Sequence, residues 1–256
     1  MNVLPDQNSK SFKNFSKEAL HDVLHFDTKL IKSLKPLIFK PGYLTLQSYT
    51  SAQNKYVKPL GLFIFLNFVF FIFKSKGLFY YQLDVYDSMS FFHDRIASRL
   101  AASHLSKEIF ADRFNLAMHF EQQEYIIVMI PLFAFVLMLF YTGKKMSYIE
   151  HLIFSIHFYC FVVIFLMICP YAAIAIAYLV SLTGNQPHFL YSEISLEIIV
   201  FIPLAIYLFF ALKRVYLQNI IVTFLKAVTL SCVFFILIVF VYRTILFYIV
   251  LHSISE

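Results

Sequence analysis

Long apolar runs separated by shorter polar segments dominate the chain after residue 58. Continuous apolar stretches are typical of membrane-spanning helices, because a bilayer core about 30 Å thick needs about 20 helical residues. The pattern predicts an all-α fold, a polytopic transmembrane helical bundle over residues 59–251 with five spans. The predicted spans cover residues 57–80, 125–141, 147–182, 196–212 and 227–251.

The third predicted span is longer than one straight crossing needs, and it contains Pro170. We therefore expect a kinked or tilted helix over residues 147–182. Between the fourth and fifth spans, residues 213–226 form a predicted loop with an amphipathic piece.

Two regions outside the predicted spans have amphipathic helical patterns. Residues 1–58 are basic and are interrupted at Pro36 and at Pro41-Gly42. This pattern predicts short helices that lie on the membrane surface. Residues 83–124 are polar with apolar positions at helical spacing, which predicts a small helical insertion outside the membrane.

The composition and the charges refine this picture. The chain is 60% hydrophobic and 14% charged, whereas soluble domains carry about 25% charged residues. The net charge is +6, and Lys and Arg concentrate on one side of the predicted topology. The positive-inside rule then places the N-terminus in the cytoplasm and the C-terminus outside. The basic residues expected to face anionic membrane lipid are Lys29, Lys32, Lys35, Lys40, Lys144, Lys145, Lys213 and Arg214.

A first candidate functional face lies at the start of the third predicted span and comprises Glu150, His151 and His157. Glu150 and His157 are seven residues apart, so they share one helix face, whereas His151 lies about 100° from Glu150. An ionisable group inside a membrane is costly and is a candidate for function, here a proton relay or a ligand-binding face. The alternative is that the histidine is neutral and hydrogen-bonded between helices.

Other polar residues have weaker signals. Asn67 and Arg243 are intramembrane polar residues, for which an interhelical hydrogen bond and an interfacial anchor are the simplest roles. His21 and His25 share a helix face with Glu18 and Asp22 and are weak candidates for a metal site, which a solvated polar face explains equally well. The three cysteines have no CxxC spacing. We therefore predict no metal and no cofactor.

Several short motifs resemble those of an uncharacterised family of bacterial integral membrane proteins. The motifs are Lys40-Pro41-Gly42, Tyr56-Val57-Lys58-Pro59, the Tyr148, His151 and His157 set, and Ala211–Gln218. Members of that family often begin with a CxxCG zinc ribbon, which is absent from this sequence. The resemblance implies a multi-pass protein of the bacterial cytoplasmic (inner) membrane, and it brings no established activity.

Three functions remain open from the sequence. The preferred one is a transport, channel or membrane-complex component, because no catalytic signature accompanies the intramembrane polar residues. A membrane-embedded enzyme acting on lipid or isoprenoid substrates is the second, and an oligomeric membrane-depolarising defence effector is the third. The expected partners are anionic membrane lipid and either further copies of the chain or a membrane complex. No nucleic acid is expected, because the basic residues are not interleaved with aromatics in a stripe.

Overall fold

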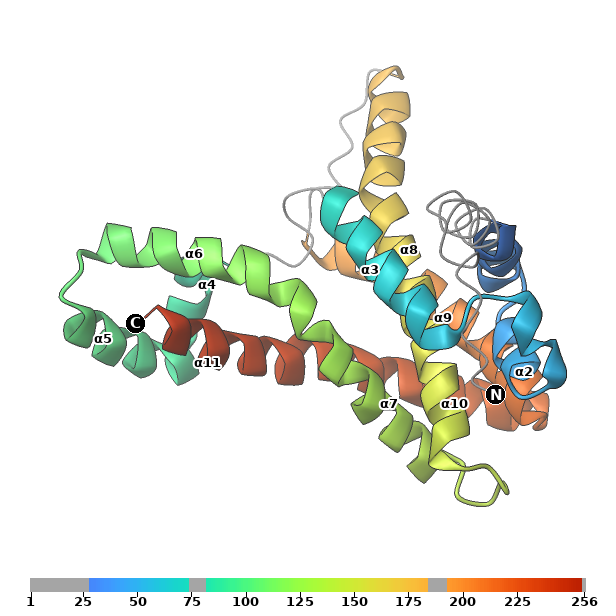
Figure 1. Cartoon of the computed structure of the whole chain (residues 1–256). Helices are drawn as coiled ribbons and strands as arrows, with labels where there is room; N and C mark the ends of the chain where they lie inside the picture. The colour runs from blue at the N-terminus through green and yellow to red at the C-terminus, as the bar shows by residue number, and fades with distance from the viewer. Residues whose placement is uncertain (1–27, 74–81, 184–192, 255–256) are drawn as a thin grey trace, which may run out of the picture.

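The computed structural model describes residues 28–73, 82–183 and 193–254, and each regular element within them is a helix (Figure 1). His21 and His25 lie outside the described residues. In chain order the elements are a helix over residues 28–39, α2 (Tyr43–Ser48), η2 (Ser51–Lys55), α3 (Pro59–Phe73), α4 (Leu83–Asp87), α5 (Ser90–Ser103), α6 (Lys107–Glu124), α7 (Ile126–Phe140), α8 (Tyr148–Ser181), α9 (Glu193–Tyr216), α10 (Ile220–Ile236), the π-helical η4 (Leu237–Tyr242) and α11 (Arg243–Ser253).

Four helical stretches are long and apolar enough to cross a membrane. They are Ser51–Ile72, Tyr148–Ser181, Ile199–Tyr216 and Ile220–Ser253. A fifth crossing results if the α6–α7 pair, bent by 57°, counts as one span. The prediction of an all-α polytopic helical bundle is thus confirmed, and the number of apolar helices indicates a multi-pass membrane protein.

The connection between α9 and α10 is shorter than the predicted loop over residues 213–226. α9 continues to Tyr216, and α10 begins at Ile220. Leu217 ends α9 with a positive φ of 49°, and the Asn219 side chain accepts a hydrogen bond from the Ile221 N–H at 3.0 Å. This N-cap starts the helix earlier than the apolar pattern indicates.

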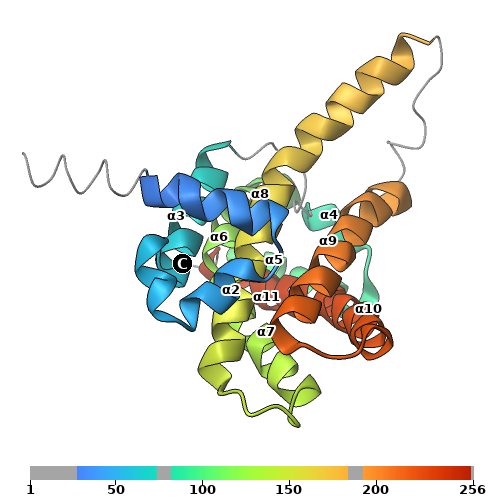
Figure 2. The same cartoon turned by 90° about the vertical axis from the view of Figure 1, so that its right-hand side faces the viewer.

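The long helix α8 lies at the centre of the molecule and packs against α3 and α7. It remains helical through Pro170, and its second half projects beyond the other helices (Figure 2). Most side chains on this projecting half are exposed and apolar, with Ile174, Tyr178 and Leu179 as examples. Lipid would cover such a surface in a membrane.

The insertion between α3 and α7 is covered by the C-terminal helix. α11 packs against α6, and α4, α5, α6 and α11 lie together at one end of the molecule (Figure 1). Phe247 of α11 is fully buried and contacts three aromatic rings of the insertion: Tyr86, Phe92 and Phe114, with ring centroids 5.0, 4.5 and 5.9 Å away. Residues far apart in sequence thus share one core.

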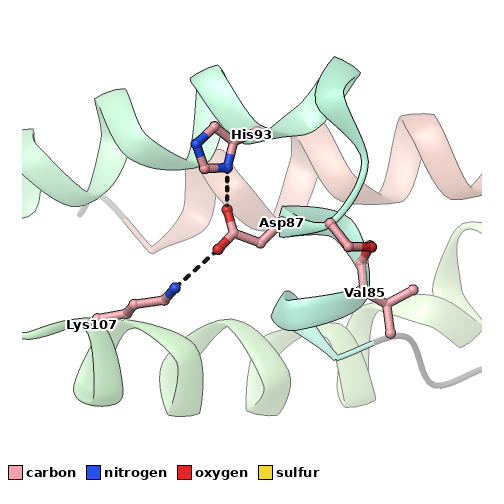
Figure 3. A network of polar contacts seen from close by, with 5 residues as sticks. Val85, Asp87, His93 and Lys107 are labelled. Atoms are coloured by element: carbon pink, nitrogen blue, oxygen red, sulfur yellow. Dashed lines mark hydrogen bonds and ion pairs between the residues drawn. The ribbon is translucent and has the colours of Figure 1, made fainter.

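A carboxylate joins the three helices of the insertion (Figure 3). His93 Nδ1 lies 2.9 Å from one oxygen of Asp87, and Lys107 Nζ donates to the other at 3.0 Å. The hydrogen bond from Lys107 is the main cause that lowers the pKa of Asp87 below its ordinary value. At the C-terminal end of α4, the Ser88 hydroxyl donates to the Val85 carbonyl at 2.7 Å.

Candidate functional site

The residues of the predicted functional face lie where the N-terminal segment docks on α8 and α9. We call residues 28–58 the platform. Two of its side chains bond to α8: Thr45 Oγ1 lies 3.2 Å from His157 Nδ1, and the Tyr49 hydroxyl donates to the Glu150 carbonyl at 2.8 Å. Burial raises the pKa of Tyr49, so this hydroxyl stays a donor.

Two further hydrogen bonds fasten the platform to α9. The Tyr207 hydroxyl donates to the Leu37 carbonyl at 2.8 Å, and the Arg214 guanidinium donates to the Pro41 carbonyl. Both acceptors lie at the C-terminal end of the helix over residues 28–39 or just after it, where helical carbonyls have no partner in their own helix. The apolar helix α9 thereby caps the platform's first helix.

A glycine permits the close approach of the platform to α9. Gly42 has a φ of 75°, and a Cβ atom built on it would lie 2.8 Å from the Ala211 carbonyl oxygen and 3.1 Å from a methyl carbon of Val215. A side chain at this position would face both backbone strain and a steric clash. The Pro41-Gly42 turn is therefore a packing requirement of this joint.

Four side chains form a continuous stack, one each from α8, α9, α10 and the residue that follows α7. His151 Nδ1 is 2.7 Å from the Tyr216 hydroxyl. The Tyr216 ring lies parallel to the Tyr141 ring, with centroids 3.6 Å apart and an interplanar angle of 14°. Lys226 Nζ lies 4.1 Å from the Tyr141 ring centroid, a cation–π contact. The stack connects α8, α9, the end of α7 and α10.

The structure does not bring Glu150 and His157 together, although they share a helix register. Glu150 forms a capping box with Ser147 at the first turn of α8, where its carboxylate accepts from the Ser147 N–H at 2.7 Å. His157 is 4% exposed and faces Thr45, and His151 is 1% exposed and faces Tyr216. Each histidine bonds a hydroxyl from another element.

The other predicted residues are placed as follows. Asn67 in α3 and Arg243 at the start of α11 are half-buried. Of the basic surface residues, Lys29, Lys32, Lys35, Lys40 and Lys145 are exposed, whereas Lys144, Lys213 and Arg214 are half-buried. Across the described part of the chain, no group of three His, Cys, Asp or Glu side chains could hold a metal ion.

Several residues of the site gave no signal in the sequence. Thr45, Tyr49, Tyr141 and Tyr207 lie in apolar or amphipathic stretches in which tyrosine and threonine are common. Only tertiary packing gives them partners: the platform packs on α8 and α9, and α9 packs on α8 and on the end of α7. Two further residues of the site had a sequence signal: Lys226 is a cation inside an apolar run, and Tyr216 lies in the Ala211–Gln218 motif.

Comparison with known proteins adds a family match and no activity. A family described as "Protein of unknown function (DUF3667)" matches residues 27–71. These residues comprise all of the platform, including the Pro41-Gly42 turn, and nearly all of α3. The match agrees with the resemblance to an uncharacterised family over this segment. No curated protein and no solved structure matches the chain.

Proposed function

We propose that the protein is a non-enzymatic component of a membrane complex in the bacterial cytoplasmic membrane. In this proposal the apolar helices hold the basic platform at the cytoplasmic surface, where it contacts anionic lipid. The observation that carries the proposal is the set of four hydrogen bonds, described above, that fix the platform on α8 and α9. Polar groups that bond between elements inside an apolar bundle define the relative position of those elements.

The arrangement of the connecting segments supports a cytoplasmic platform. The platform, the α7–α8 turn and the α9–α10 turn lie at the same end of the molecule, since Tyr49 bonds to Glu150 and Arg214 bonds to Pro41. These are the basic segments that the positive-inside rule assigns to the cytoplasm. The insertion and α11 pack together away from them (Figure 1).

The exposed face of the platform's first helix has the chemistry of a helix at a membrane surface. Ser33 and Leu37 are buried against the bundle. On the opposite side, Ile31 is 68% and Phe39 76% exposed, and Lys32 and Lys35 lie between them. Exposed apolar side chains can enter the headgroup region while adjacent lysines contact lipid phosphates, with each lysine contributing about 1 kcal/mol.

Native mass spectrometry of the full chain released from a bilayer tests this proposal. Nanodiscs would contain equal amounts of phosphatidylglycerol and phosphatidylcholine. We expect phosphatidylglycerol to remain preferentially bound, and we expect Lys32→Gln with Lys35→Gln to reduce that preference. The matched control is Arg95→Gln with Arg113→Gln, which removes the same charge from exposed positions of the insertion.

The same experiment can contradict the proposal in two ways. An equal loss of bound phosphatidylglycerol in both double variants would mean that the platform has no special contact with anionic lipid. A change in the mass of the lipid during incubation with purified protein would reveal an enzyme. The proposal also expects a defined homo-oligomer or co-purifying membrane partners, so an isolated monomer from native membranes would oppose it.

A further inference from the structure

The C-terminal helix is longer than one membrane crossing. α10, η4 and α11 form one apolar stretch, Ile220–Ser253, which has 34 residues. At 1.5 Å per residue the stretch measures about 51 Å, whereas the hydrocarbon core of a bilayer is about 30 Å thick. Tilt alone does not remove the difference, because it would have to exceed about 50° and membrane helices tilt by at most about 40°. Part of this helix therefore lies outside the hydrocarbon.

The α11 end of the helix packs against helices that carry exposed charges. α11 packs on α6, and its Phe247 is buried among aromatic rings of the insertion. On α6 the side chains of Lys107, Asp112 and Arg113 are exposed, and Lys107 bonds to Asp87 of α4 (Figure 3). Charged side chains exposed to hydrocarbon are costly. The core that α11 shares with the insertion thus suits a position beyond the membrane surface.

The opposite end of the helix has the reverse character. We call residues 217–225 the hairpin tip, since they join α9 to α10 and form the first turns of α10. Its exposed apolar side chains are Leu217, Ile220, Ile221, Val222, Phe224 and Leu225. Leu217 is 79% and Ile221 67% exposed, and the sequence has no charged residue between Arg214 and Lys226. Consecutive helical residues point about 100° apart, so the apolar surface extends around the helix.

The first cation after the hairpin tip is satisfied within the protein. The Lys226 Nζ donates to the Phe140 carbonyl at 2.7 Å and lies 4.1 Å from the centroid of the Tyr141 ring. A lysine at a water-exposed surface needs neither contact, because water solvates its ammonium group. A lysine surrounded by lipid needs such partners, and carbonyl oxygens and aromatic faces supply them. These contacts favour lipid around the start of α10.

The surface of the hairpin tip also continues into that of the membrane span. Ile221, Leu225 and Val228 are exposed at the spacing i, i+4, i+7, which places them on one face of α10. Cys232, four residues further along, is exposed as well. The apolar strip therefore passes from the tip into the span without a polar boundary, which favours one covering for both, the acyl chains of the bilayer.

We propose that α10 and η4 make the crossing, with the hairpin tip among the acyl chains of the leaflet on the platform's side and α11 beyond the opposite surface. The 17 residues of α10 and the six of η4 measure about 35 Å at α-helical rise, which fits one bilayer core with a moderate tilt. Arg243 then lies at the far surface. Relative to the apolar pattern of residues 227–251, the crossing is shifted towards the N-terminus.

The accessibility of single nitroxide spin labels tests this position. Each chain carries one cysteine, with the other native cysteines replaced by alanine, in vesicles of equal phosphatidylcholine and phosphatidylglycerol. Oxygen concentrates in hydrocarbon, whereas a water-soluble nickel chelate is excluded from it. We expect the oxygen-to-chelate accessibility ratio at Ile221→Cys to approach that of native Cys232, an exposed position within the crossing. The matched controls Lys145→Cys and Ser253→Cys, both exposed, are expected to give low ratios.

Four outcomes would overturn the proposal. A ratio at Ile221→Cys as low as that at Lys145→Cys would place the hairpin tip in water. Low accessibility to both reagents there, with broadening from a second label, would mean that another copy covers the tip. A high ratio at Ser253→Cys would place α11 in the hydrocarbon, and chelate access at Cys232 would exclude the crossing itself. None of these outcomes depends on the lipid headgroup, so they are independent of the platform's contact with anionic lipid.

Discussion

His151 and His157 both point into the protein, and each bonds a hydroxyl group of another element. Helical periodicity correctly places Glu150 and His157 on one register, but register does not determine the partner. His157 faces Thr45, which precedes it by 112 residues. The two histidines of α8 thus contact other elements of the fold, whereas the Glu150 carboxylate caps its own helix. A role of these residues in proton transfer or ligand binding stays a prediction.

Gly42 gives the sharpest test of the joint between the platform and α9. Gly42→Ala is expected to lower the free energy of unfolding by at least about 1–2 kcal/mol, since an alanine at positive φ is strained and its Cβ would lie 2.8 Å from the Ala211 carbonyl oxygen. Thermal unfolding in detergent measures the change. Gly143→Ala is the matched control, because a Cβ there meets nothing within 4 Å. An equal effect of both substitutions would contradict the role of Gly42.

At the scale of elements, α11 has two neighbours of different kinds. It continues the apolar α10–η4 helix, and it also supplies the core of the insertion through Phe247. The apolar pattern of residues 227–251 indicates a membrane span and gives no sign of this second contact. The packing of α11 on α6 therefore links the C-terminus to the insertion.

Phe247→Ala is expected to loosen the insertion without disrupting the platform. Removal of a fully buried phenylalanine costs about 3–5 kcal/mol, and the lost contacts are with Tyr86, Phe92 and Phe114. Hydrogen exchange should therefore accelerate in α4 and α5 and stay unchanged in α2. Tyr248→Ala, at a neighbouring position that is 41% exposed, serves as the control. Faster exchange throughout the chain would show that α11 stabilises the whole bundle instead.

At the scale of the whole molecule, the polar segments gather at two separate ends. The platform and the turns after α7 and α9 form one end, and the insertion with α11 forms the other. An alternating path of five crossings would produce this grouping, since successive connections must emerge on opposite sides of a membrane. The direction of the path, with the N-terminus inside, stays a prediction from the charges.

Cysteine labelling in intact cells tests that direction. In a chain whose own Cys160, Cys169 and Cys232 are replaced by alanine, Lys145→Cys and Ser253→Cys each provide one exposed thiol. We expect a membrane-impermeant maleimide to label position 253 in intact cells and position 145 only after permeabilisation. Labelling of position 145 alone in intact cells would reverse the orientation. Labelling of both positions would contradict the odd number of crossings.

The sequence by itself determined the fold class, because long apolar runs can satisfy their backbone groups in a membrane only as helices. It also identified the Pro41-Gly42 turn and the two histidines of α8 as special positions, since glycine after proline and ionisable groups in apolar runs have local physical costs. These properties depend on near neighbours along the chain and on the solvent that surrounds a helix.

Only the tertiary structure decided which residues form the site. The contacts that define it join residues that are distant in sequence. They are the Thr45–His157 pair, the His151–Tyr216–Tyr141–Lys226 stack and the contact of Phe247 with the insertion. An apolar helix has many faces of similar hydrophobicity, so periodicity cannot select which face meets which neighbour. That selection depends on the shapes of the packed side chains, on the close backbone approach at Gly42 and on the pairing of buried hydrogen-bonding groups.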